Sequence, residues 1–391
     1  MKNFQFYNPT KVIFGCTEFK NIGPEVKSLG LSALLIKQEG PLEKMGVYAK
    51  AHQYMKDSGV TAYDLDGITS NPKLSKIEEG ITLVKAKKIE VIVAVGGGSA
   101  IDTAKAVAFG ALDDGDVWDF FTRERTIQKS LPVIAVSTIS ATGAETSCHC
   151  VVTNDRNPNV SEWKKWAVHD AHAFPKTAII DPELLLSVPV KLTAAGMADT
   201  ISHIIEGYFD GIPDNPISDR IGEGIVMTVL ENDGVLANPN DVSARGAISW
   251  AATLAMNGLQ DCGRSNEGFP AHWIQHAVGA LTDSSHGEGL AVINPAWLEL
   301  INAKDPKKFV QFTERVFRIQ RTPEMSEVEY GQLGISMLKA KFKSWGLPTT
   351  LKDLGVTEEM LPILVKNIMD SPETYVFSET DLMKVLKSCL G

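Results

Sequence analysis

Three histidines lie close together in the segment AHWIQHAVGALTDSSHGEG, residues 271–289. Apolar residues recur at helical spacing in its first half, so His272 and His276 are predicted to lie one turn apart on one helix face. The polar cluster at 283–285 favours a turn that folds the chain back and brings His286 towards the first two rings. Imidazoles gathered in this way are candidate ligands for a transition metal.

A second segment, LTAAGMADTISHIIEGYFD at 192–210, adds a carboxylate and a fourth imidazole. Asp199 and His203 are four residues apart on a helical pattern and therefore share a face. A D-x-x-x-H spacing also arises by chance, and a histidine on an apolar helix is often structural. Together, however, the two segments offer a mixed oxygen and nitrogen ligand set. Such a set suits Fe2+, Zn2+ or Mn2+ better than calcium or magnesium, which prefer oxygen ligands.

A glycine run marks a third candidate site. In VIVAVGGGSAIDTAKAVA, residues 91–108, a buried-type strand ends in the glycine triplet 96–98 and a helix is predicted to begin at Ser99. Glycines let a phosphate approach the backbone, and a helix N-terminus offers unpaired N–H groups. Ser99 can cap this helix, and Asp102 lies near its first turn, where a carboxylate complements the helix dipole. The run lacks the G-x-G-x-x-G spacing, so a tight turn without a ligand is the alternative.

Hydroxyl side chains cluster after the next predicted strand, in VSTISATGAETS at 136–147. Thr138, Thr142 and Ser147 belong to this segment. Ligands of open α/β sheets bind beyond the carboxyl ends of the strands, so these side chains are candidates for cofactor contacts. A hydroxyl-rich loop without a ligand is again the alternative.

The elements that position these residues change character along the chain. Up to about residue 185, β-rich runs alternate with helical patterns, which predicts an α/β layer with a largely parallel sheet. Strands are predicted at 11–14, 33–37, 61–65, 90–95, 132–137 and 177–180, and helices at 43–58 and 73–88. Beyond that point strand signals nearly vanish. Helices are predicted there at 194–209, 216–232, 241–258, 271–281, 290–301, 306–319, 326–345 and 358–369.

This change predicts two domains, an α/β domain at residues 1–185 and an all-helical domain at 186–391, with the boundary around DPELLLSVPV. A chain of 391 residues is too long for one ordinary core and fits two. The phosphate-type turns fall in the first domain and the candidate metal ligands in the second. The expected site is therefore a cleft between the domains.

Composition narrows the classes of function. A net charge of −10 argues against nucleic acid as a partner, because phosphates repel an acidic surface. The sequence has no run of 18 apolar residues and no apolar signal region, so neither a membrane span nor secretion is expected. Five scattered cysteines indicate a reducing cytoplasm. Cys148, His149 and Cys150 look like a metal motif, but the valines that follow favour a strand, and no second Cys/His pair accompanies them.

Four motifs, in order along the chain, resemble those of the iron-containing, or group III, alcohol dehydrogenases, and most closely the NAD(P)H-dependent butanol dehydrogenase branch. They are G-G-G-S-x-x-D-x-x-K at 96–105, T-x-x-x-T-G-x-E at 138–145, D-x-x-x-H at 199–203, and H-x-x-x-H at 272–276 with a further histidine ten residues on. The phrases FYNPTKVIFG, EGIVMTVLEN and SWAATLAMNGL extend the likeness over essentially the whole chain. The resemblance implies a dehydroquinate-synthase-like fold, with an N-terminal Rossmann-like dinucleotide-binding domain and a C-terminal helical metal-binding domain.

The resemblance also implies roles for individual residues. Asp199, His203, His272 and His286 would bind one divalent metal, with Fe2+ favoured and Zn2+ as the alternative, while His276 would face the nicotinamide and the substrate. The candidate contacts to the cofactor, NAD or NADP, are Gly97, Gly98, Ser99, Asp102, Asn71, Gln38, Thr138, Thr142, Ser147 and Lys165. A solvated surface lysine is an equally good interpretation of Lys165. A homodimer is expected from the family likeness alone.

Two stretches depart from the family pattern. After the second predicted strand, many NAD-preferring members have an aspartate or a G-G-G-S turn, whereas this chain has Lys37, Gln38 and Glu39 followed by Gly-Pro. Gln38 cannot repel a 2′-phosphate as a carboxylate does, Lys37 could attract one, and Glu39 could oppose it, so the choice between NAD and NADP stays open. Serines at 284–285 stand where relatives often have a proline or an apolar residue, which makes the substrate-facing wall more polar.

The activity that the resemblance implies is reversible hydride transfer between NAD(P)(H) and a primary alcohol or aldehyde such as butanol or butyraldehyde. Rival reactions on the same fold are polyol oxidation of the glycerol or propanediol type, and a synthase or lyase reaction on a phosphorylated sugar. A sugar phosphate would need cationic side chains near the histidines, and Arg264 is the single candidate. The rival from another class is a non-catalytic metal- or nucleotide-binding relative, against which the complete ligand set and the glycine turn argue.

Overall fold

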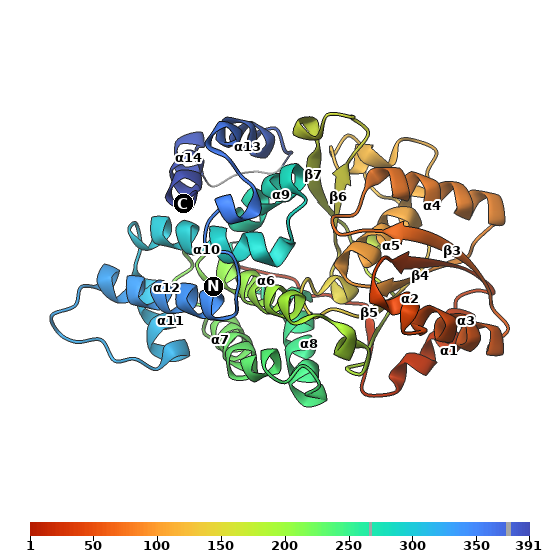
Figure 1. Cartoon of the computed structure of the whole chain (residues 1–391), viewed down its shortest axis with the longest axis horizontal. Helices are drawn as coiled ribbons and strands as arrows, with labels where there is room; N and C mark the ends of the chain where they lie inside the picture. Colours follow the sequence, from red (N-terminus) through yellow and green to blue (C-terminus); the bar gives the residue numbers. More distant parts are fainter. Residues whose placement is uncertain (266–267, 373–376) are drawn as a thin grey trace. The chain divides into compact units, whose positions relative to one another are not determined.

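The computed structural model describes residues 1–265, 268–372 and 377–391 (Figure 1). The chain forms two compact units. The α/β unit contains Asn8–Val188 and Asn240–Thr253, and the helical unit contains Met1–Tyr7, Pro189–Pro239 and Leu254–Gly391. The units are therefore not simple halves of the chain, because a segment from the second half groups with the α/β unit.

A parallel sheet is the centre of the α/β unit. Within the described residues it has the strand order β1-β8-β5-β4-β2-β3, with every neighbouring pair parallel. The strands are β1 (Lys11–Phe14), β2 (Ser32–Gln38), β3 (Thr61–Ile68), β4 (Val91–Gly96), β5 (Val133–Ser137) and β8 (Thr177–Ile180). The inner strands β4, β5 and β8 are buried along their whole length and rich in β-branched residues, as expected for a sheet covered on both faces.

Helices cover both faces of this sheet (Figure 1). Side chains alternate along β2, so Ala33 and Leu35 pack with α1 (Ile22–Lys27) and α3 (Val47–Asp57). Leu34 and Ile36 pack on the opposite face with α4 (Leu74–Lys87) and α5 (Gly98–Gly110). A separate antiparallel pair, β6 (His149–Asn154) and β7 (Lys164–His169), lies beside α5.

The helical unit is built around one buried helix. Its helices among the described residues are α6 (Val190–Tyr208), α7 (Pro216–Glu231), α9 (Pro270–Thr282), α10 (His286–Asn302), α11 (Lys307–Phe317), α12 (Glu327–Ser344), α13 (Leu361–Met369) and α14 (Glu379–Ser388). Helix α8 (Val242–Met256) belongs largely to the α/β unit. Helix α10 contacts α6, α9, α12 and α14 and is buried throughout 287–298. A helix that is apolar all round must be enclosed in this way.

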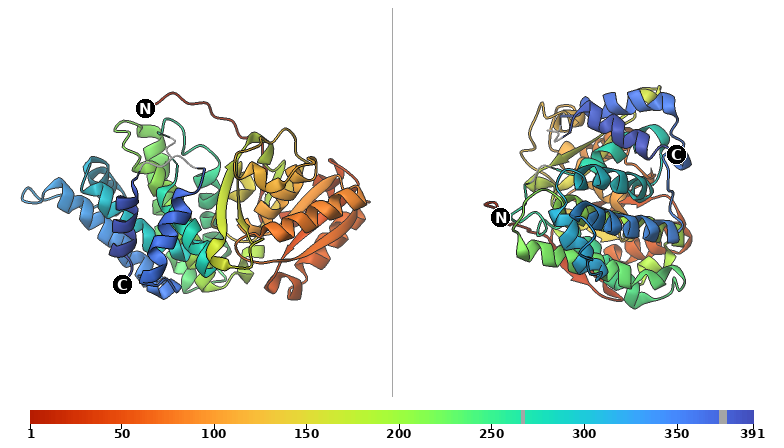
Figure 2. Two further views of the ribbon diagram at one scale, coloured as in Figure 1. Left: turned by 90° about the horizontal axis from the view of Figure 1, so that it is seen from above. Right: turned by 90° about the vertical axis from the view of Figure 1, so that its left-hand side faces the viewer.

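Figure 2 shows the same helices from two further sides, and the first ten residues as an extended segment that forms no helix or strand. No helix among the described residues is both long and apolar enough to cross a membrane.

The predicted fold class, a parallel α/β sheet followed by helices, is confirmed, and several local predictions are corrected. The helix predicted at 43–58 is two helices, α2 (Pro41–Lys44) and α3, because Gly46 adopts φ 71° between them. Helix α10 begins at His286 rather than at 290. Helix α5 begins at Gly98 with Gly97 before it, so Ser99 lies inside the first turn and does not cap it. The β7 strand and α14 were not predicted.

Candidate metal centre and cofactor turn

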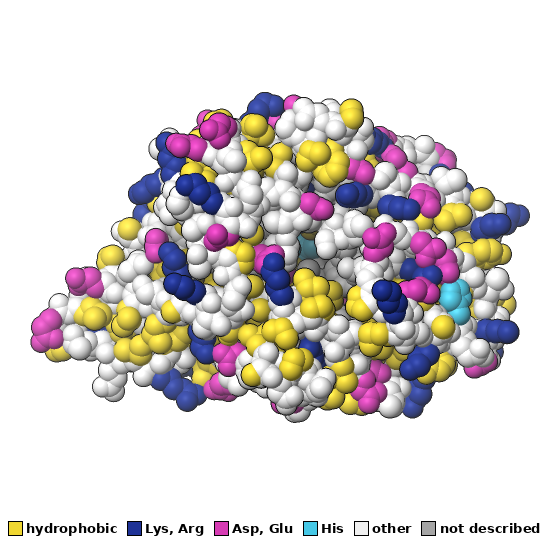
Figure 3. All heavy atoms as spheres, in the orientation of Figure 1, with side chains coloured by type: hydrophobic (Ala, Val, Ile, Leu, Met, Phe, Trp, Pro, Cys, Tyr) yellow, Lys and Arg dark blue, Asp and Glu magenta, His cyan; other side chains and the backbone are white. Residues whose placement is uncertain are grey.

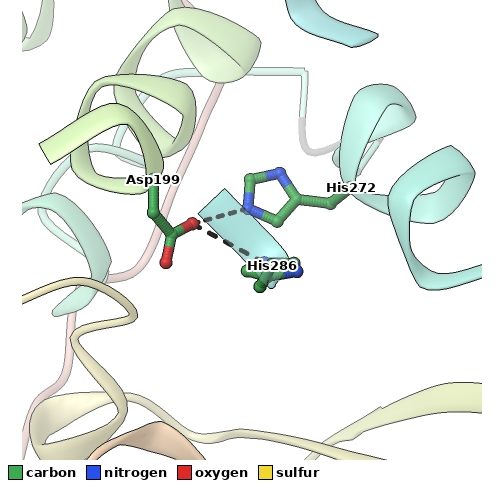
Figure 4. Close-up of side chains that lie close together, drawn as sticks. All are labelled: Asp199, His272 and His286. Atoms are coloured by element: carbon green, nitrogen blue, oxygen red, sulfur yellow. Dashed lines mark ion pairs between the residues drawn. The ribbon is translucent and has the colours of Figure 1, made fainter. Parts of the chain in front are cut away.

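Three helices of the helical unit direct polar side chains at one point. Asp199 comes from α6, His272 from α9 and His286 from the first position of α10, and Figure 4 shows the three side chains converging. Asp199 Oδ1 lies 3.6 Å from Nε2 of His272 and 3.6 Å from Nε2 of His286. The Nε2 atom of His203, one turn further along α6, lies 3.7 Å from the same oxygen.

These distances fit a tetrahedral metal site. A tetrahedral shell with metal–ligand bonds of about 2.1 Å separates neighbouring ligand atoms by about 3.4 Å. Asp199 Oδ1 and His272 Nε2 are also buried without any hydrogen-bond partner among the described residues, since contacts of 3.6 Å are too long for hydrogen bonds. Leaving such atoms unsatisfied is costly, and a bound cation removes that cost. The residues present therefore fit a divalent metal.

Neighbouring side chains hold two of the imidazole rings. Nδ1 of His272 contacts Glu206 Oε1 and must donate its hydrogen there, while Glu206 Oε2 accepts a hydrogen bond from the Ala271 N–H at 2.6 Å. Nδ1 of His286 contacts Oε1 of Gln275. In each ring Nδ1 is thereby engaged and Nε2 points towards Asp199, which is the orientation of metal-binding histidines in proteins.

Two glycines let α10 approach its neighbours closely enough to place His286. A Cβ at Gly287 would lie 1.9 Å from the backbone oxygen of Ala195 in α6. A Cβ at Gly289 would lie 2.7 Å from Cγ of Gln275 in α9. Since no side chain larger than hydrogen fits at Gly287 without movement of the backbone, the H-G-E-G sequence is a packing requirement of the site.

Burial and charge set opposite protonation states on two of the rings. Burial lowers the pKa of His203 to about 4, so this ring is neutral at neutral pH and ready to bind a metal. Burial would also lower the pKa of His272, but the Glu206 and Asp199 carboxylates outweigh it and raise the pKa to about 9. Without a metal, His272 therefore holds a proton that a metal would displace.

His276 lies beside this cluster. Its ring is buried, with its centroid 6.4 Å from that of His272 and 5.6 Å from that of His286. The ligand atoms that all lie within 4.8 Å of one another come from Asp199, His272 and His286, so this group contains neither His276 nor His203, although His203 Nε2 lies 3.7 Å from Asp199 Oδ1. Two histidines one turn apart on α9 thus have different surroundings, which the helical spacing alone could not have shown.

In the α/β unit, the glycine turn lies at the carboxyl edge of the sheet, next to several of the predicted cofactor residues. The Gly97 N–H donates a hydrogen bond to Gln38 Oε1 at 2.7 Å, and the Thr138 N–H donates one to the Gly96 carbonyl at 3.0 Å. A Cβ at Gly98 would lie 2.6 Å from Oγ1 of Thr142. The structure therefore brings the ends of β2, β4 and β5 together around the start of α5.

Other predicted cofactor residues make contacts within the α/β unit that the sequence did not indicate. Asp102 Oδ2 accepts a hydrogen bond from the Val151 N–H at 3.1 Å, which joins α5 to β6, and burial raises its pKa. Ser147 Oγ accepts one from the His149 N–H at 3.1 Å. Lys165 is buried and donates to Asn71 Oδ1 at 2.8 Å, so it is not the solvated surface lysine of the alternative interpretation.

Glu206 and Gln275 were missed by sequence reasoning. For Glu206 a signal exists, because residues 199, 203 and 206 follow each other at spacings of four and three on one face of α6. A carboxylate on the same face as two predicted ligands is a natural partner for a third ligand's free ring nitrogen. No such signal marks Gln275, whose contact depends on the return of α10 alongside α9.

The sequence matches two models of known families. "Iron-containing alcohol dehydrogenase" matches residues 9–182, and "Fe-containing alcohol dehydrogenase family, C-terminal" matches residues 193–389. The probable NADH-dependent butanol dehydrogenase 1 of Bacillus subtilis is 33% identical over the full length of both chains. The NADPH-dependent aldehyde reductase YqhD of Escherichia coli is 30% identical over 98% of this chain and 97% of its own length.

Solved structures agree with these matches. The crystal structure of NADH-dependent butanol dehydrogenase A from Thermotoga maritima superposes with a TM-score of 0.93 at 36% identity, covering 100% of this chain and 99% of that one. Both family models and full-length relatives thus point the same way as the converging carboxylate and imidazoles. The chain belongs to the iron-containing alcohol dehydrogenase family.

Proposed function

We propose that this chain catalyses reversible hydride transfer between a nicotinamide dinucleotide and a primary alcohol or aldehyde, such as butanol and butyraldehyde. As a member of its family it is an oxidoreductase of the alcohol dehydrogenase type. The observation that carries the proposal is the meeting of one carboxylate oxygen and three imidazole nitrogens, at distances suited to a catalytic metal, in a chain related over its full length to butanol dehydrogenases.

We infer that Asp199, His203, His272 and His286 hold one divalent metal. Iron is favoured by the family, and zinc is accepted by the same ligand types. When bound, the metal supplies Lewis-acid chemistry, which polarises an aldehyde oxygen or lowers the pKa of an alcohol. Glu206 contributes by fixing the His272 ring with Nε2 towards the other ligands.

We infer that the glycine turn binds the dinucleotide. The backbone of Gly97, Gly98 and Ser99 at the start of α5 offers N–H groups and a positive dipole end to a pyrophosphate. Further contacts are proposed for Thr138, Thr142 and Ser147 on the nicotinamide side, and for Gln38, Asn71, Asp102 and Lys165 elsewhere along the cofactor. The nicotinamide carries the hydride, and these residues orient it.

His276 is proposed to move the proton of the substrate hydroxyl. An imidazole titrates near neutral pH when unperturbed and can act as both donor and acceptor. The proposal is supported by the position of its ring, whose centroid lies 5.6 Å from that of the His286 ring.

Four expectations from the family likeness and the sequence remain proposals. We propose that the protein acts as a homodimer, in the cytoplasm and without nucleic acid or membrane partners. We also propose that its working domains are a dinucleotide-binding domain at 1–185 and a metal and substrate domain at 186–391.

The rival functions are weakened by particular contacts. Arg264, the one cation suggested for a sugar phosphate, is buried and donates to Asp219 Oδ1 at 2.8 Å, so its charge already has a partner. Polyol oxidation stays the second candidate, because the 1,3-propanediol dehydrogenase of Citrobacter freundii is 28% identical over 93% of this chain. A relative that binds no metal would have no reason to bury Asp199 Oδ1 and His272 Nε2 without partners, whereas a non-catalytic metal-binding relative is distinguished from an enzyme by turnover alone.

The test is turnover and metal content measured on the same sample. Purified protein is reconstituted with Fe2+ or Zn2+. It is assayed with butyraldehyde and with the hydroxyaldehyde formed by oxidation of 1,3-propanediol, and each aldehyde is tested with both NADH and NADPH. His272→Ala should abolish metal retention and turnover together, whereas His172→Ala, an exposed histidine of the α/β unit, should change neither. One metal per chain in His272→Ala would refute the ligand assignment, and wild-type protein without turnover on any aldehyde would favour a binding protein.

A further inference from the structure

Lys105 is a fully buried lysine in the middle of α5 that the proposed function does not use. On the face shown in Figure 3, lysine and arginine side chains stand at the surface, whereas Lys105 is 0% exposed. An ammonium group enclosed in this way needs partners, because burial removes its hydration. Its Nζ donates a hydrogen bond to the His149 carbonyl at 2.6 Å and lies 3.5 Å from Oδ1 of Asp102, one turn earlier in α5. This lysine therefore joins α5 to β6.

Asp102 contacts the same edge of β6. In the described structure β6 shares a sheet with β7 only, so the backbone groups on its other edge need partners from elsewhere. Backbone groups two residues apart in a strand point to the same edge, as the His149 carbonyl and the Val151 N–H do. The Val151 N–H donates to Asp102 Oδ2 at 3.1 Å, and Sγ of Cys150 donates to the Asp102 carbonyl at 3.2 Å. The Asp102–Lys105 ion pair thus supplies β6 with one acceptor and one donor, as a neighbouring strand would.

Further along this edge the hairpin of β6 and β7 is fastened to a second segment. The Thr153 N–H donates to the Pro72 carbonyl at 2.7 Å. From β7, Lys165 donates to Asn71 Oδ1 at 2.8 Å. The hairpin is therefore held by α5 on one side and by residues 71–72 on the other. Both segments carry proposed cofactor contacts, since α5 begins at the glycine turn and Asn71 belongs to the second.

We propose that Lys105 is a positioning residue for the dinucleotide, and this role rests on the proposed function because the segments that it aligns are the proposed cofactor contacts. Being fully buried, Lys105 acts through the His149 carbonyl. Together with Asp102 it holds β6 against α5, and the hairpin in turn sets where Lys165 and Asn71 lie relative to the glycine turn. Without the ammonium, the His149 carbonyl loses its donor and the Asp102 carboxylate loses its charge partner. The hairpin then loosens from α5, while the metal ligands of the helical unit keep their contacts.

The test compares Lys105→Met with Lys85→Met on the metal-loaded enzyme. Methionine removes the ammonium and keeps an unbranched apolar stem. Lys85 is the matched control, because its Nζ also donates to a backbone carbonyl of the α/β unit, that of Asp113 at 2.9 Å, but its side chain is 46% exposed.

We expect Lys105→Met to raise both the Kd of NADH, followed by nicotinamide fluorescence, and the KM for NADH at least about tenfold, since small misplacements of binding groups are costly. At saturating NADH, kcat should stay within about threefold of wild type, because the lost contacts orient the cofactor before the hydride moves. The metal Kd should not change. Lys85→Met should match wild type in all four quantities.

Amide hydrogen exchange measures the loosening itself. In Lys105→Met we expect exchange at least about tenfold faster in residues 149–153 and 164–169, and unchanged in β4, because local opening follows the contacts of each segment. A raised NADH Kd with wild-type exchange in the hairpin would overturn the proposed role.

A second variant separates positioning from the cost of an unpaired buried charge. Asp102→Asn combined with Lys105→Met removes the uncompensated carboxylate but still leaves the His149 carbonyl without its donor. We expect this double variant to be more stable to urea than Lys105→Met, and to bind NADH at least about tenfold more weakly than Asp102→Asn alone. Should Lys105→Met fail to fold, this comparison carries the test.

The outcomes distinguish the positioning role from the proposed function. A wild-type NADH Kd in Lys105→Met, or a double variant that binds NADH as well as Asp102→Asn does, would overturn the role of Lys105 and leave the proposed function intact. Wild-type protein that binds neither NADH nor NADPH would overturn the proposed function and the role of Lys105 with it.

Discussion

Gly287→Ala should release the metal although it changes no proposed ligand. A Cβ at this position would lie 1.9 Å from the backbone oxygen of Ala195 and 2.6 Å from its carbonyl carbon. Real Cβ atoms essentially never approach another atom within 3.0 Å. The start of α10 and the facing turn of α6 would therefore have to separate by about 1 Å, because a packed interior cannot absorb the overlap.

The size of the effect follows from the neighbouring ligand. His286 is adjacent in sequence, and its Nε2 lies 3.6 Å from Asp199 Oδ1, a distance that matches a shared metal. Metal–ligand distances tolerate deviations of only about 0.2 Å, so a shift of about 1 Å removes the ring from its place. A misplacement of that size typically costs about 100-fold in a functional site, and we expect the metal Kd to rise by about that factor. Overpacking should also cost about 1–3 kcal/mol of stability.

Gly224→Ala in α7 is the matched control, because no atom of the described residues outside that helix lies within 4 Å of its Cβ position. It should leave metal affinity unchanged and stabilise the protein by up to about 1 kcal/mol. Metal affinity is measured by competition with a chelator of known affinity, and stability by urea unfolding of the metal-free protein. Wild-type metal affinity in Gly287→Ala would refute the claim that close approach of α10 to α6 builds the site. Equal losses in both variants would show that the effect is not local.

Two further predictions concern the His272 ring. Glu206→Gln should weaken metal binding about 10- to 100-fold, because the glutamine can still accept the Ala271 N–H but supplies no charge to the imidazole. Unchanged affinity in chelator competition would limit Glu206 to capping the start of α9. The second is a pH dependence: the metal-free site binds a proton on His272 with a pKa of about 9, and the metal-bound site does not. Metal affinity should therefore rise about tenfold per pH unit from pH 7 to 8, with about one proton released per metal bound. Isothermal titration at these pH values measures both, and a metal affinity that does not change with pH would contradict the prediction.

The sequence predicted the parts of the fold whose signals are local and repeated. Strands such as VIVAV in β4 and TAII in β8 are short, β-branched and bounded by turn residues, so their positions were found to within a residue or two. The β7 strand was missed because KKWAVH pairs only with β6, outside the main sheet, and its burial depends on that partner. Helix α14 has a capping box between Ser378 and Asp381 that could have revealed it.

The candidate site was predictable in its residue types but not in its contacts. The candidate ligands are of residue types that bind transition metals, and their spacings predicted that they converge: Asp199, His203, His272 and His286. Whether a lysine is buried depends on which way its strand faces, so Lys165 could not be distinguished from a surface residue until Asn71 was seen opposite it. For the same reason Lys37 looked like an attractor of phosphate, whereas its carboxylate partners come from α2, which directly follows its strand, and from the neighbouring strand β3.

The difference between His272 and His276 shows what helical spacing cannot decide. Both lie on one face of α9, one turn apart, and α10 returns between them so that the His286 ring is 5.1 Å from that of His272 and 5.6 Å from that of His276. By distance from His286 alone, either ring could share a metal with it. The asymmetry comes from α6, because Glu206 accepts hydrogen bonds from the first turn of α9 and holds His272 against Asp199. A ring placed one turn further along α9 lies beyond that carboxylate, which is why we propose that it handles the proton and not the metal.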